Sequence, residues 1–119
     1  PALTALARAR RGKPLQLDVF KLPHHASKSN VTRSLLSVAP ARHYIVSTSG
    51  ARFHHPDDIA LARVVTSGVR QPTLWFNYAS RAAERWSAPE LRAKYGFEVR
   101  QPTAASQPGV HIELPARQP

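Results

Sequence analysis

The sequence predicts an α/β fold, in which short strands alternate with helices along the chain. Short apolar or β-branched runs are bounded by proline and glycine, which favours strands. Segments with one apolar side at helical spacing lie between these runs. The 119 residues are 42% hydrophobic, which is enough for one packed core and argues against a wholly disordered chain.

The chain is expected to begin with a helix and a strand. Residues 2–11 (ALTALARARR) place leucines on one side of a helix with a basic end, and Gly12 and Pro14 stop it. Residues 15–22 (LQLDVFKL) alternate apolar and polar side chains, which is typical of a strand, and Pro23 ends it.

The next two elements are a short helix and the clearest strand. Asn30 is a suitable N-cap for a helix over residues 31–38, which ends before Pro40. Residues 43–48 (HYIVST) are β-branched and aromatic, and a loop containing Gly50 follows them. We therefore expect a buried strand at this point.

A second helix and a third strand follow in the middle of the chain. Pro56 suits a first helical turn, and Asp57 and Asp58 favour the positive end of the helix dipole. Apolar residues supply a buried face as far as Gly68. Residues 73–78 (TLWFNY) then predict the third strand.

The last third of the chain contains shorter elements. A helix is expected over residues 88–95, and Gly96 suits the residue that ends it. Residues 97–100 and 110–114 are interpreted as two short strands. Residues 115–119 are expected to form a disordered tail.

The composition limits the chemistry of the chain. It has no cysteine, which excludes disulfides, thiolate metal sites and cysteine nucleophiles. Any metal would be bound by imidazole nitrogen and carboxylate oxygen. No apolar run approaches the roughly 20 residues that span a bilayer, so no membrane segment is expected. Without a signal-peptide pattern the compartment stays open, with the cytoplasm favoured.

The charge is strongly basic, with 17 lysines and arginines against 7 acidic residues and a net charge of +10. This excess favours phosphate-containing substrates or nucleic acid as partners. An arginine-, alanine- and proline-rich composition also arises from a GC-rich gene. A generic solvated surface therefore remains an alternative.

Four of the six histidines lie in two loops that follow predicted strands. His24-His25 follows the strand over residues 15–22, and His54-His55 follows the strand over residues 43–48. Ligands of α/β sheets gather outside the carboxyl ends of the strands. Neighbouring histidines point in different directions, so one of each pair could bind a metal while the other contacts substrate. His43 and His111 are expected to be ordinary sheet residues.

The residues around these pairs resemble two linked motifs of the metallo-β-lactamase-fold hydrolases. Residues 18–27 (DVFKLPHHAS) resemble a segment of the family that reads D-h-h-K-h-P-H-H-G-S, in which h is any hydrophobic residue. Residues 45–50 (IVSTSG) and 53–56 (FHHP) resemble its later I-S-x-N/G-G and x-x-H-P segments. The branch that includes the hydrolase domain of DNA-uptake channel proteins is the most similar. The order and separation of the motifs agree.

The resemblance implies that residues 1–114 form the C-terminal half of an αββα sandwich. The complete domain would bind one or two zinc ions and hydrolyse phosphodiesters or other anionic substrates. His25 is the implied metal ligand. The implied catalytic residues, which would orient the substrate or stabilise the anionic transition state, are His24 and His55. The implied substrate contacts are Ser27, Lys28 and His54.

The sequence also departs from the family pattern. Ala26 replaces the glycine of H-H-G-S, so a left-handed backbone there would cost about 1 kcal/mol. Ser49 replaces a frequent asparagine. The family's H-x-H-x-D-H motif, which supplies most zinc ligands, does not occur in the 119 residues. Because zinc needs about three protein ligands, His25 requires the missing N-terminal half as its partner.

We therefore expect this chain to be inactive by itself. Its start at Pro1 without methionine fits a fragment or a trimmed chain. The alternative is a non-catalytic basic module that binds nucleic acid or a partner protein.

Overall fold

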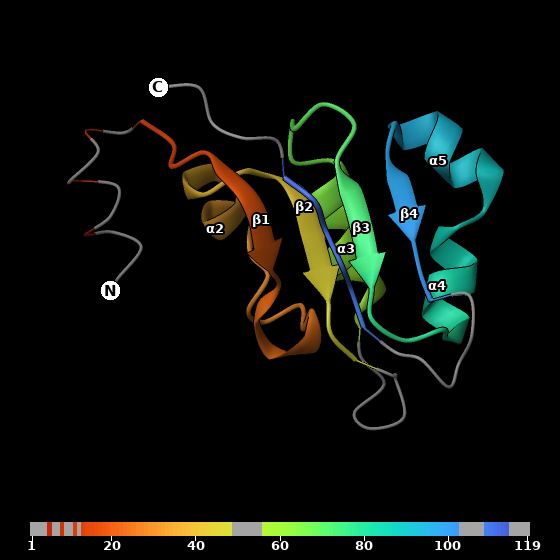
Figure 1. The fold of residues 1–119 in the computed structure, drawn as a ribbon. Coiled ribbons are helices and arrows are strands. Elements are labelled where there is room, and N and C mark those ends of the chain that lie inside the picture. Colours follow the sequence, from red (N-terminus) through yellow and green to blue (C-terminus); the bar gives the residue numbers. More distant parts are fainter. Residues whose placement is uncertain are drawn as a thin grey trace.

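Four parallel strands form one sheet in the order β1-β2-β3-β4 (Figure 1). The computed structural model describes residues 13–48, 56–102 and 109–114, and residues 5, 8 and 11 among those before them. The strands are β1 (Leu17–Lys21), β2 (Ala41–Val46), β3 (Thr73–Phe76) and β4 (Glu98–Arg100). The predicted α/β class is confirmed.

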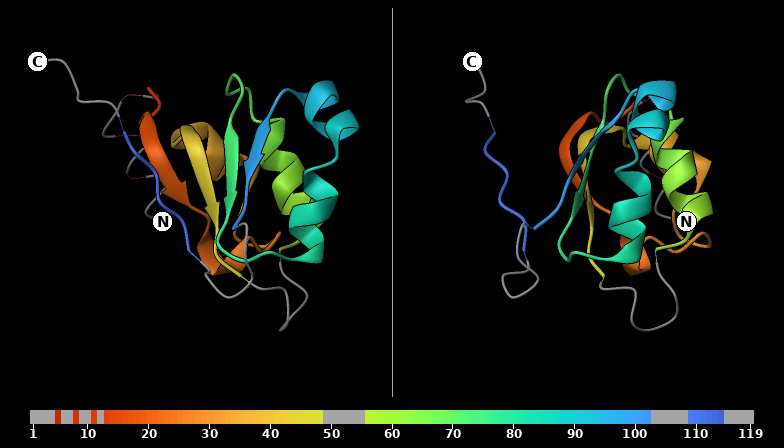
Figure 2. Two further views of the ribbon diagram at one scale, coloured as in Figure 1. Left: turned by 45° about the vertical axis from the view of Figure 1, so that its right-hand side comes forward. Right: turned by 90° about the vertical axis from the view of Figure 1, so that its right-hand side faces the viewer.

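Helices connect the strands, because a parallel pair needs a crossover rather than a hairpin. They are α2 (Arg33–Val38), α3 (Asp58–Val65), α4 (Arg81–Trp86) and α5 (Pro89–Tyr95). All four lie on the same face of the sheet (Figure 2). Within the described ranges, no helix has the length and apolar character needed to cross a bilayer.

The core lies between the sheet and these helices. Tyr44 pairs in register with Leu74, and Val46 with Phe76, and all four side chains are buried. Phe20 stacks on Tyr44 with ring centroids 6.2 Å apart. The helices add buried aliphatic and aromatic side chains, among them Leu36, Leu61, Val64 and Trp86.

The opposite face of the sheet carries half-buried side chains. Val19 lies opposite His43 in the register, and Ile45 lies opposite Trp75. These residues alternate with the core residues along each strand, so they point away from the helices. In Figure 2 residues 109–114 run along this side of the sheet. The amide of Gly109 donates to the carbonyl of Asn77 at 2.8 Å and anchors that segment.

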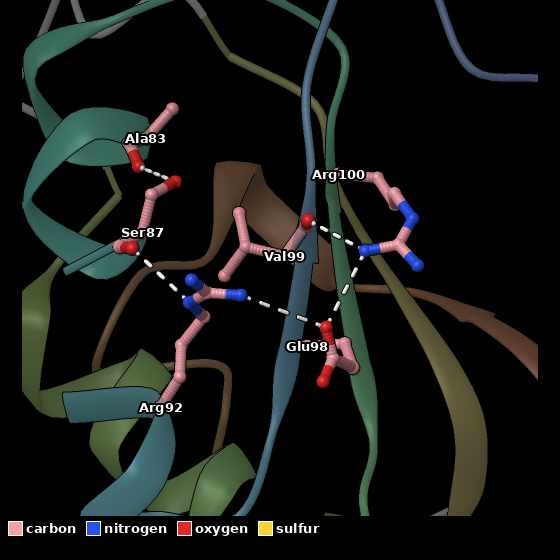
Figure 3. A network of polar contacts seen from close by, with 6 residues as sticks. All are labelled: Ala83, Ser87, Arg92, Glu98, Val99 and Arg100. Carbon is pink, nitrogen blue, oxygen red and sulfur yellow. Dashed lines mark hydrogen bonds and ion pairs between the residues drawn. The ribbon is translucent and has the colours of Figure 1, made fainter. Parts of the chain in front are cut away.

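Polar contacts attach β4 to the helices that precede it (Figure 3). Nε of Arg92 on α5 donates to the carbonyl of Ser87 at 3.1 Å. Its guanidinium also lies 3.7 Å from the carboxylate of Glu98, and Arg100 approaches the same carboxylate at 3.5 Å. These ion pairs are exposed, so they position β4 more than they stabilise it.

Several predicted boundaries change. The strands predicted over residues 15–22, 43–48, 73–78 and 97–100 are present with shifted ends. Asn30 does not cap α2. The helix begins at Arg33, and the hydroxyl of Thr32 accepts from the amide of Leu35 at 3.1 Å. Asn30 instead belongs to a turn in which its amide donates to the carbonyl of Ser27.

Two elements differ in kind from the prediction. Helix α4 was not predicted, and it begins where the hydroxyl of Ser80 accepts from the amide of Ala83 at 3.1 Å. The strand predicted over residues 110–114 is wrong, because this segment has no hydrogen-bonded neighbour strand. The helix predicted over residues 2–11 is described only at residues 5 and 8, which are helical, and at residue 11, which forms a turn. The tail at 115–119 lies outside the described residues.

Candidate functional site

The chain leaves β1 at the carboxyl edge of the sheet through a tight turn. A 3₁₀ turn (Pro23–His25) comes first, and the amide of Ala26 donates to the carbonyl of Pro23 at 3.1 Å. His25 and Ala26 both have a left-handed backbone, with φ of 56° and 63°. Only glycine adopts this region without cost. The family pattern has a glycine at the position of Ala26, and the backbone has the conformation that a glycine would favour.

The ring of His25 reaches the end of the neighbouring strand. Its Nδ1 lies 2.5 Å from the carbonyl oxygen of Ser47. A carbonyl oxygen can only accept, so Nδ1 carries the proton, and Nε2 of the neutral ring keeps its lone pair. The side chain is exposed. This tautomer, fixed by a backbone carbonyl, is the one found in histidines that bind metals through Nε2.

Helix α3 holds the loop from the other side. The carboxylate of Asp57 accepts from the amide of Lys28 at 2.7 Å, and the amide of Asp57 donates to the carbonyl of Ala26 at 3.0 Å. Nη1 of Arg63 donates to the carbonyls of Lys28 and Val31 at 2.8 and 3.0 Å. These four hydrogen bonds fix the backbone on which His25 stands.

The third strand also contributes to this edge. Nδ2 of Asn77, just after β3, donates to the hydroxyl of Ser47 at 3.1 Å. Its Oδ1 is buried and finds no hydrogen-bond partner in the described part of the chain. Such an acceptor costs about 1–3 kcal/mol when it stays unsatisfied. His25, Ser47 and Asn77 therefore connect the carboxyl ends of three neighbouring strands.

The structure describes some of the expected site residues and not others. Ser27 is almost fully buried, and its hydroxyl accepts from the amide of Ser29 at 3.3 Å. Lys28 is exposed beside it. The side chain of His24 is not described, and His54 and His55 lie outside the described residues. Among the described residues, no three histidine or acidic side chains gather closely enough to hold a metal ion.

The remaining two histidines lie away from this edge. His43 stands on the open face of the sheet, as expected for a strand residue, and Nε1 of Trp75 donates to its Nδ1 at 3.0 Å. Burial and the charge of Arg42 lower the pKa of His43, against the opposing charge of Asp18. His111 is not in a strand. It lies 3.7 Å from the carboxylate of Glu113 at the surface.

Sequence reasoning did not identify Arg63 or Asn77, and it treated Asp57 only as a helix-start residue. An arginine on an amphipathic helix has the pattern of a solvated side chain, so nothing in the sequence marks Arg63. For Asn77 a signal did exist, since a polar residue at the end of the strand predicted over residues 73–78 shares the edge that carries His25.

Comparison of the chain with models of protein families, with curated proteins and with solved structures found no match. The structure establishes the class, an α/β domain with a four-stranded parallel sheet. A narrower assignment rests on the two sequence motifs and on the geometry around His25.

Proposed function

We propose that the chain is the C-terminal half of a metal-dependent hydrolase with the metallo-β-lactamase fold, acting on phosphodiesters or other anionic substrates. The hydrogen bond from Nδ1 of His25 to the carbonyl of Ser47 carries this proposal. It directs the lone pair of Nε2 away from the backbone, as a metal ligand requires.

The backbone around His25 supports the same proposal. The left-handed conformation of Ala26 occurs at the motif position where the family has glycine. The strain of about 1 kcal/mol is retained, and the loop is held by Asp57 and Arg63. Strained backbone that is firmly held is typical of functional sites. Helix α3 begins at Asp58, so a helix does follow the second motif, but Pro56 precedes this helix instead of occupying its first turn as predicted.

The arrangement of layers fits half of an αββα sandwich. The described helices cover one face of the sheet (Figure 2). By the alternation of side chains along the strands, Val19, Ile45 and Trp75 lie on the other face, along which residues 109–114 also run. A sheet face with half-buried apolar side chains is suited to packing against a second sheet. We infer that the N-terminal half of the domain is the partner that covers it.

The residues of this chain have separate roles in the proposed reaction. A bound zinc ion would supply a hydroxide nucleophile by lowering the pKa of water. His25 fits as one of about three ligands that zinc needs, and the upstream H-x-H-x-D-H motif would supply the others. His24 and His55 would orient the substrate or stabilise the anionic transition state. Lys28 and His54 would contact the substrate, whereas the buried hydroxyl of Ser27 favours a role in holding the loop.

The first test is the gene sequence ahead of Pro1, which should encode H-x-H-x-D-H. The second is zinc titration by calorimetry of the protein with both halves, comparing His25→Ala with His111→Ala. Losing one of three ligands should weaken zinc binding by more than about 100-fold. The His111 variant should bind as the parent does. Equal affinity in the parent and the His25 variant would contradict the proposal.

The alternative function, a non-catalytic basic module that binds nucleic acid, is favoured by the net charge of +10. It predicts that the metal-free chain binds DNA with affinity that falls steeply as salt rises. It also predicts that substitution of His25 has no effect on that affinity.

A further inference from the structure

A cleft opens at the amino edge of the sheet, on the side opposite to His25. Its volume is about 800 Å³. It lies where β1, β2 and β3 begin, and the segment before β1, the end of α2 and the loop before β3 line it. The polar residues of its lining are Gln16, Ser37, Arg42, Ser67, Arg70 and Gln71.

The charged residues that line the cleft are all basic. Arg42 and Arg70 both line it, and no acidic residue does. Asp18 lies opposite Arg42 in the register of β1 and β2, but it is not part of the lining. Two guanidinium groups in one concave surface favour an anionic ligand, above all a phosphate.

The loop that carries Arg70 has a defined shape. Gly68 and Gln71 have left-handed backbones, with φ of 95° and 49°. The hydroxyl of Ser67 donates to the carbonyl of Val64 at 2.7 Å. Below it, the buried hydroxyl of Tyr44 accepts from the amide of Ala41 at 3.0 Å. A non-glycine residue at positive φ is sparsely populated and occurs preferentially at ligand sites.

We propose that this cleft binds a small phosphorylated ligand of about nucleotide size. Its volume lies within the range of about 300–1,000 Å³ that small-molecule sites occupy, and a phosphate alone would fill little of it. The arginines would bind the phosphate. The glutamine amides and the apolar surface of Pro14, Pro40 and Val69 would contact the organic part. This proposal does not depend on the proposed hydrolase function, because its residues lie at the other edge of the sheet.

The test is calorimetric titration of the full chain with three probes, namely adenosine monophosphate, ribose 5-phosphate and pyrophosphate. Arg42→Gln and Arg70→Gln are compared with Arg81→Gln, an exposed arginine beyond the other end of β3. Each cleft variant should weaken binding by at least about tenfold, since a charged hydrogen bond contributes about 1.5–3 kcal/mol. The Arg81 variant should stay within about twofold. Amide chemical shifts of residues 67–71 should move on titration of the parent.

Thermal unfolding of each variant checks that the variant folds. If a variant does not fold, the changes in amide chemical shift of the parent still test the proposal. Absence of binding by all three probes at about 1 mM would overturn the proposal. So would equal binding by the cleft variants and the Arg81 variant. Binding of oligothymidine with no binding of the small probes would also overturn it, and would support a nucleic-acid surface instead.

Discussion

Nε1 of Trp75 donates a hydrogen bond to Nδ1 of His43 across the open face of the sheet, at 3.0 Å. The ring centroids are 5.9 Å apart and the planes are tilted by 58°. Because the indole can only donate, this bond requires an unprotonated Nδ1. Burial and the charge of Arg42 act in the same direction, since both lower the pKa of His43 below its usual value of 6.5, against Asp18.

This relationship predicts a loss of stability on acidification. Below about pH 6.5 the unfolded chain binds a proton at this histidine that the folded chain resists, so the free energy of unfolding falls as the pH falls. Urea unfolding at about pH 7.5 and pH 5.5 should show a larger loss for the parent than for His43→Gln, which cannot titrate. His111→Gln should behave as the parent does. Equal losses in the parent and the His43 variant would show that His43 does not contribute.

The strand that carries His43 could be predicted, because residues 43–48 combine β-branched and aromatic side chains between a proline and a glycine. Its partnership with Trp75 could not. The two residues are 32 positions apart, and their contact depends on the register between β2 and β3. A single sequence contains no information on that register. Helix α4 was missed for another reason: it is only six residues long, and two of its three buried residues are alanines.

The candidate site, too, could be predicted only in part from the sequence. A loop at His25 was predicted from the end of the preceding strand and is present. The left-handed backbone of Ala26 was not predicted, since only the cost of such a backbone could be stated from the sequence. The second left-handed residue, His25 itself, and the hydrogen bonds from Arg63 were not predicted. Both depend on contacts between segments that are distant in the sequence. The ring of His25 reaches the carbonyl of Ser47 after β2, and Arg63 of α3 binds the backbone of the loop.

Ala26→Gly should cost little stability, although Ala26 is fully buried. Relief of the left-handed strain contributes about 1 kcal/mol. The lost methyl costs about 0.8 kcal/mol, and the freer unfolded chain costs up to about 1 kcal/mol. We expect a net loss below about 1 kcal/mol. Ala60→Gly, at a fully buried alanine in α3, gains no relief and should cost about 2 kcal/mol. Similar losses in urea unfolding of the two variants would show that Ala26 is not strained.

Arg63→Met should loosen the loop that carries His25. The variant keeps an apolar stem but loses both hydrogen bonds, and the carbonyls of Lys28 and Val31 lose a charged donor. We expect a loss of about 2 kcal/mol. Amide hydrogen exchange of residues 26–31 should accelerate more than exchange in β2. Arg33→Met, at the exposed first residue of α2, should leave the stability and the exchange of residues 26–31 unchanged. Unaltered exchange in the Arg63 variant would mean that the loop holds its shape without α3.

Asp58 connects α3 to α4, because its Oδ1 accepts from Nη2 of Arg85 and from Nε1 of Trp86, each at 3.0 Å. Burial raises the pKa of this carboxyl, but the two hydrogen bonds and the charge of Arg85 outweigh it and hold the pKa below 3.8. The stabilisation is therefore present above about pH 4 and is lost as the pH falls further. Because the pair is more than half exposed, Asp58→Asn should cost at most about 1 kcal/mol at neutral pH.

The difference between the parent and the Asp58→Asn variant should shrink when both are unfolded in urea at about pH 3. Glu84→Gln removes an exposed carboxylate from the neighbouring helix and serves as the control. It should leave the free energy of unfolding unchanged at both pH values. A difference for Asp58→Asn that persists undiminished at low pH would show that the shape of the side chain, and not its charge, connects the two helices.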